Sequence, residues 1–146
     1  MKSKYTIIRE EYNPETFESL VEIETSIGRF IGTTVAEGID QEYPSMLQGN
    51  QIALAKAQKK FAKAAIRILK AEVAIYENCL NCLQPVDHFW DELGYDNLNK
   101  EYHHKLAELA TWKRRLINVG QTVQLRVAAR DRITETFLKK NKDKED

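Results

Sequence analysis

At 146 residues the chain is long enough for one domain, and its 42% hydrophobic and 30% charged residues, with six Gly and three Pro, exclude a disordered chain and favour a mainly helical one. Basic and acidic residues number 22 each, and a net charge of zero argues against a polymer of nucleic acid as the partner. No segment has the roughly 20 consecutive apolar residues of a membrane span, and the N-terminal residues lack the apolar run of a signal peptide. We therefore expect a cytoplasmic protein with no membrane partner.

The N-terminal part of the chain has the pattern of β-strands. Segments of β-branched or alternating apolar residues, separated by turn-forming residues, lie at 5–9, 20–25 and 29–36. A three-stranded antiparallel meander within residues 1–42 is the simplest arrangement of these segments. Gly28 and Gly32 flank Phe30 in the third strand, where glycine indicates a bulge or the close approach of another backbone.

After the strands, apolar residues recur with the spacing of an α-helix. We predict a first long helix over residues 45–83, with a basic outer face and many alanines that let a neighbouring element pack closely. Residues 84–97 should interrupt the pattern, and a second long helix is predicted over residues 98–138. The charged run at residues 139–146 has no apolar residue and is predicted to be a disordered tail.

Together these elements predict the α+β class, with a small N-terminal antiparallel sheet followed by two long α-helices in a hairpin. Residues 1–138 should form a single domain. Helices of about 35 to 40 residues are roughly 50 to 60 Å long, too long for one small sheet to cover. We therefore expect a homo-oligomer, a dimer or a hexamer, that buries the remaining apolar surface.

The charges are sorted along the chain although they cancel overall. Two windows contain no Asp or Glu, residues 43–71 with a charge of +6 and residues 109–130 with a charge of +5. Sorted charge creates local potentials that can capture an anion even on a neutral protein. These windows are the first place to look for a binding site.

Cys79 and Cys82 are the only cysteines, and their C-x-x-C spacing is typical of a redox motif or of half a zinc site. A redox motif of the thioredoxin type opens a helix, whereas this pair lies near the end of one. A zinc site needs two further ligands, and the spacing from Cys82 to His103 matches no familiar zinc finger. We interpret the pair as two half-buried small apolar residues and predict no metal.

Motifs of common enzymes are missing from the chain. It contains no G-x-S-x-G, no H-E-x-x-H and no G-x-x-x-x-G-K-[ST], so we predict that it is not an enzyme and has no cofactor. Binding of a phosphate-bearing ligand is better supported, because arginine offers a planar fork that matches phosphate oxygens. The candidates on the second predicted helix are Arg114, Arg115, Arg126 and Arg130.

The order of the segments and one local pattern resemble a known family. Gly28-Arg29-Phe30-Ile31-Gly32, then Asp40, and then Gly49-Asn50-Gln51-Ile52-Ala53 with Ala57 are similar to small phage proteins of the Thoeris anti-defense type 1 family. The resemblance implies a small sheet, two long helices and oligomers up to hexamers. It also implies a sponge in the cytoplasm of an infected bacterial host, which sequesters immune signalling nucleotides without cleaving them. The implied ligands are cyclic ADP-ribose isomers and, for some members, cyclic oligonucleotides at a separate site, the signals of Thoeris and CBASS immunity.

Some site residues carry over from the resemblance. A basic residue early on the first helix, usually arginine in the family, corresponds to Lys56 and would contact a cyclic oligonucleotide, although lysine lacks the bidentate fork. The family's cyclic ADP-ribose pocket has a base-stacking aromatic, for which Phe89 or Trp90 is the counterpart. It also has arginines of the second helix, for which two of the four arginines named above are the counterparts.

Two other functions are compatible with parts of the pattern. A helical nucleic-acid-binding protein would use the basic face of the first helix along a phosphate backbone, against which the neutral total charge and the flanking acids argue. A ligand-free coiled-coil scaffold explains the long helices but not the sorted charge. Sequestration of a cyclic nucleotide is the leading hypothesis.

Overall fold

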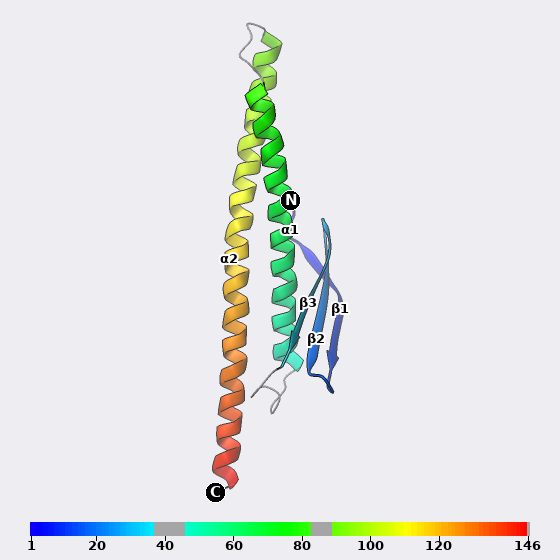
Figure 1. Cartoon of the computed structure of the whole chain (residues 1–146), viewed down its shortest axis with the longest axis vertical. Coiled ribbons are helices and arrows are strands. Elements are labelled where there is room, and N and C mark those ends of the chain that lie inside the picture. The colour runs from blue at the N-terminus through cyan, green and yellow to red at the C-terminus, as the bar shows by residue number, and fades with distance from the viewer. Residues whose placement is uncertain (37–45, 83–88, 146) are drawn as a thin grey trace. The chain divides into compact units, whose positions relative to one another are not determined.

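The structure is a computed structural model of the chain, which describes the backbone of residues 1–36, 46–82 and 89–145, without the side chains of residues 89–93, 141 and 143–145. Three strands, β1 (Tyr5–Asn13), β2 (Glu18–Thr25) and β3 (Gly28–Val35), precede two helices, α1 (Met46–Cys82) and α2 (Phe89–Glu145) (Figure 1). The predicted α+β fold class is confirmed. Oligomer formation stays a prediction.

The three strands form one antiparallel sheet in the order β1-β2-β3, as predicted. The central strand alternates strictly, because successive side chains of a strand point to opposite faces. Its residues Ser19, Val21 and Ile23 have no exposed surface, whereas Glu18 and Glu24 on the other face are exposed. This alternation fixes which face of the sheet is covered.

The first half of α1 covers that face at a distance only small residues allow. A Cβ atom added to Gly32 of β3 would meet the backbone carbonyl oxygen of Ala53 and lie 2.5 Å from the backbone nitrogen of Ala57. Ala53 and Ala57 are fully buried. The predicted close approach of a backbone at Gly32 is confirmed. The small alanines of α1 form the opposite side of this contact.

The second helix is longer than predicted at both ends. It begins at Phe89 instead of residue 98 and ends at Glu145, inside the segment predicted to be a disordered tail. Gly94 does not stop it, because glycine costs a helix only about 1 kcal/mol relative to alanine. The C-terminal segment contains no Gly or Pro, and its lysines are good helix formers, so a charged surface helix continues there.

The chain divides into two compact units. The hairpin unit comprises Met1 with Ala62–Arg115, and the sheet unit comprises Lys2–Phe61 with Leu116–Asp146. The core of the hairpin unit consists of apolar residues from both helices, Ala62, Ala65, Ile66, Leu69, Leu109 and Trp112. The single domain over residues 1–138 stays a prediction. No helix in the described part of the chain is both long and apolar enough to cross a membrane.

Candidate functional site

The cations of the first basic window have no carboxylate partners in the described structure. In the hairpin unit, Lys63, Arg67 and Lys70 are exposed on α1, and none forms an ion pair with any described residue. In the sheet unit, Lys56 is half-buried and likewise has no described carboxylate partner. Lys60 differs, because its Nζ donates to the backbone carbonyl oxygen of Ile31 at 2.7 Å on the edge strand β3.

Two of the four predicted arginines contact neighbouring side chains in the sheet unit. Arg126 donates from Nη1 to the side-chain oxygen of Gln51 at 2.6 Å, which joins α2 to α1. The side chain of Arg130 is only 12% exposed, with Nε 4.0 Å from a carboxylate oxygen of Asp131. Both side chains therefore make contacts within the protein, and their contact with a ligand stays a prediction.

The other two arginines, Arg114 and Arg115, lie in the hairpin unit and differ in their surroundings. The guanidinium of Arg115 lies over the indole of Trp112, with Cζ 4.8 Å from the ring centre. Arg114, one residue earlier, is exposed and lines neither of the hollows described below. The two differ because neighbouring helical residues point about 100° apart. The side chains of Phe89 and Trp90 lie outside the described residues.

Arg115 and Trp112 border an open hollow of about 290 Å³ in the hairpin unit, which we call the tryptophan hollow. A guanidinium that stacks on an indole is held in orientation by attraction to the ring face, and its in-plane N–H groups stay available for an anion. The indole itself is only 3% exposed, so it acts as a fixed platform for Arg115. The lining residues are Met1, His104, Ala107, Glu108, Thr111, Trp112 and Arg115.

The carboxylate of Glu108, which lines the tryptophan hollow, lies beside a cationic group. Glu108 accepts a hydrogen bond from the Met1 ammonium at 3.2 Å and lies 3.2 Å from Nε2 of His104. Burial raises the pKa of Glu108, but the hydrogen bond and charge of the ammonium, with Lys105 and His104, outweigh burial and hold the pKa below its ordinary value. Beside it, the hydrogen bond to Glu72 at 2.8 Å raises the pKa of Lys105.

This arrangement predicts that the hairpin unit loses stability in acid. A carboxyl whose pKa is lower in the folded than in the unfolded chain stabilises the fold fully above the unfolded pKa of about 4.3, and that contribution disappears as the pH falls through the folded pKa. We expect Glu108→Gln to remove part of the acid-dependent fall in melting temperature. The exposed Glu101→Gln is the matched control on α2, and an equal effect of both changes would contradict the assignment.

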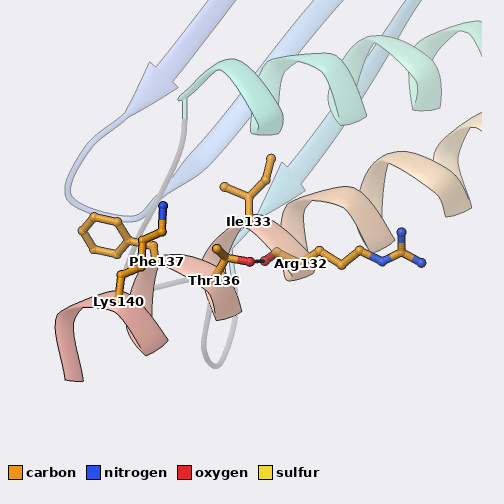
Figure 2. A pocket seen from close by; sticks show the side chains of 5 residues that line it. All are labelled: Arg132, Ile133, Thr136, Phe137 and Lys140. Atoms are coloured by element: carbon orange, nitrogen blue, oxygen red, sulfur yellow. Dashed lines mark hydrogen bonds between the residues drawn. The ribbon is translucent and has the colours of Figure 1, made fainter. Parts of the chain in front are cut away.

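A second open hollow of about 330 Å³ lies along α2 in the sheet unit, and we call it the phenylalanine hollow. Its lining residues are Arg132, Ile133, Thr136, Phe137 and Lys140. Figure 2 shows the Arg132 side chain extended along the helix away from Phe137, while the Thr136 hydroxyl donates to the backbone carbonyl oxygen of Arg132 at 2.8 Å. The Arg132 cation therefore does not lie over the ring of Phe137 in the way that Arg115 lies over Trp112.

The sequence interpretation missed Trp112, Thr111 and His104 as neighbours of Arg115. A signal for Trp112 was present, because residues three apart on a helix face the same side and Trp112 precedes Arg115 by three. The side chain of His104 is 68% exposed, so most of it faces solvent. What the sequence does not show is that its edge reaches the hollow.

The structure corrects the interpretation of the two cysteines. Both Cys79 and Cys82 are exposed and free, not half-buried. Among the described residues, no group of three or more His, Cys, Asp or Glu side chains is placed to hold a metal ion. No protein-family model, curated protein or solved structure matches this chain.

Proposed function

We propose that the protein binds a phosphate-bearing cyclic nucleotide of the cyclic ADP-ribose class and holds it without chemical change, as a viral sponge for an immune signal. The observation that carries the proposal is Arg115, which lies over the ring of Trp112 at the tryptophan hollow and has no carboxylate partner among the described residues. An arginine fork is the side chain best suited to bidentate contact with phosphate oxygens.

The chemistry of a nucleotide fits this side chain. The guanidinium lies over the indole, and a guanidinium can also stack on a purine base while its N–H groups donate to a phosphate. Because the Met1 ammonium compensates the charge of Glu108, the carboxylate does not repel the ligand strongly. The Thr111 hydroxyl supplies a further polar group at the lining, although it now donates to the backbone carbonyl oxygen of Ala107.

The small volume and open shape of the hollow favour a site that a second subunit completes. A volume of about 290 Å³ lies just below the usual range for small-molecule sites, about 300 to 1,000 Å³, and this hollow is open to solvent. A neighbouring subunit that covers it would complete the cradle. In the same unit, the apolar side chain of Ile75 on α1 is 62% exposed and could mediate such a contact.

A nucleic-acid-binding function is the second candidate, and exposed cations favour it. Lys63, Arg67 and Lys70 project from one helix without described ion pairs, as a surface that follows a phosphate backbone would. Binding of that kind would weaken steeply with salt, by about 0.9 log units per neutralised phosphate for each tenfold rise in salt. A gel shift with duplex DNA across a salt series separates it from capture of a small ligand.

Calorimetry with a panel of ligands tests the proposed function. We expect at least one cyclic ADP-ribose isomer to bind with a Kd below about 1 μM, a free energy of about −8 kcal/mol or better. Cyclic dinucleotides and trinucleotides test the second ligand class that Lys56 suggests. AMP and inorganic phosphate should bind far more weakly, because each supplies only part of the contacts. If no cyclic nucleotide binds below the micromolar range, the proposal is wrong.

A further inference from the structure

Cys79 and Cys82 form a pair of thiols at the end of α1. They are the only cysteines of the chain, they lie three residues apart in the last turn of the helix, and both are exposed and free. Side chains three apart on a helix are neighbours on one face, with about 5 to 6 Å between their Cβ atoms. Both sulfur atoms can therefore reach one metal ion.

The position of the pair favours a metal over redox chemistry. Reactive thiol pairs of the thioredoxin type lie at the start of a helix, where backbone N–H groups and the helix dipole stabilise the thiolate. This pair occupies the opposite end, where unpaired carbonyl groups gather. A metal ion supplies the missing positive charge and binds the thiolate, so a coordinating thiol releases its proton to solvent.

Within the described residues, Cys79 and Cys82 supply half of a closed zinc site. Structural Zn²⁺ takes four ligands in a tetrahedron, often four cysteines in two C-x-x-C pairs. In the described part of the chain no third His, Cys, Asp or Glu joins a metal-binding group. A second copy of the chain offers an identical pair, and a contact of two identical surfaces about a twofold axis is the commonest way for a protein to pair with itself.

We propose that Cys79 and Cys82 of two chains together bind one Zn²⁺ ion through four thiolates, which joins two copies at the ends of their α1 helices. Each thiol transfers its proton to solvent as its Zn–S bond forms, so four protons leave for every zinc bound. No oxidant is needed. Asn78 before the pair and Asn81 between the two cysteines are exposed and leave the thiols accessible.

Zinc titration of the full chain under a reductant that does not bind zinc tests this proposal. We expect saturation at one zinc per two chains, a twofold rise in mass by light scattering relative to the same protein with chelator, and reversal when chelator is added. Cobalt in place of zinc should give the intense thiolate-to-metal absorption of a tetrahedral sulfur site.

Matched variants distinguish the site from nonspecific metal binding. Cys79→Ser and Cys82→Ser should each abolish the rise in mass, whereas Asn81→Ser, an exposed change in the same turn, should leave it intact. Binding of one zinc per chain without a change in mass would overturn the proposal, as would an unchanged zinc response in either serine variant. Nucleotide binding by the serine variants should equal that of the original protein, so the proposed function is tested separately.

Discussion

Replacement of Arg115 by glutamine should weaken binding of cyclic ADP-ribose by roughly 10- to 100-fold. A hydrogen bond to a charged group contributes about 1.5 to 3 kcal/mol, and every 1.4 kcal/mol is a factor of ten in affinity. Glutamine keeps a polar side chain of similar reach but loses the charge and the fork that lies over Trp112. Calorimetry under the conditions used for the original protein measures the change.

Arg114→Gln is the matched control for this change. It removes the same charge from the preceding residue of the same helix, but Arg114 is exposed and lines neither hollow. We expect less than about a threefold loss, because an exposed charge is screened by solvent and salt. Equal losses of affinity in the two variants would assign the effect to the general positive potential of α2. If Arg115→Gln loses no affinity, the tryptophan hollow does not bind the ligand.

Replacement of Gly32 by alanine should destabilise the sheet unit by about 3 kcal/mol or more. The new methyl group would meet the backbone of α1 at Ala53 and Ala57, so the whole helix must move away from the sheet. A backbone cannot rotate out of the way as a flexible side chain can. We expect thermal denaturation to show a melting temperature lower by roughly 6 to 12 °C.

Gly120→Ala is the control for Gly32→Ala, since it makes the same chemical change inside a helix. A Cβ atom at Gly120 would meet nothing within 4 Å, so alanine should stabilise α2 by about 0.5 to 1 kcal/mol. The two variants should thus move the melting temperature in opposite directions. A neutral effect of Gly32→Ala would contradict the close contact between β3 and α1.

The strands and the first helix could be predicted because their patterns are local. Alternation in β2 identifies the buried Val21 and Ile23, and the spacing of Gly32 within a strand indicates the close approach that Ala53 and Ala57 complete. The predicted ends of α2 were wrong, because the local signals at both ends are weak. A glycine at residue 94 and a charged C-terminal segment are weak stop signals, because neither contains the proline that would break a helix.

The candidate site was only partly predictable. The absence of acids between residues 109 and 130 indicates where phosphate could bind, but it does not separate Arg115, which lies over an indole, from Arg126, which a glutamine of α1 engages. That difference depends on the folded structure, since Arg126 contacts the other helix whereas Arg115 lies over a residue of its own helix. The exposure of Cys79 and Cys82 was missed because cysteine is usually buried in folded proteins.

Capture and recovery of the ligand tests the central claim most directly. The original protein, in excess over cyclic ADP-ribose, is passed through a filter that retains protein, and the retained protein is then denatured by heat. Capture without chemistry predicts that free ligand disappears from the filtrate and that the full amount returns, chemically unchanged, after denaturation, whereas Arg115→Gln leaves more of it free. Ligand that passes the filter at its starting concentration, or that returns cleaved, would contradict the account.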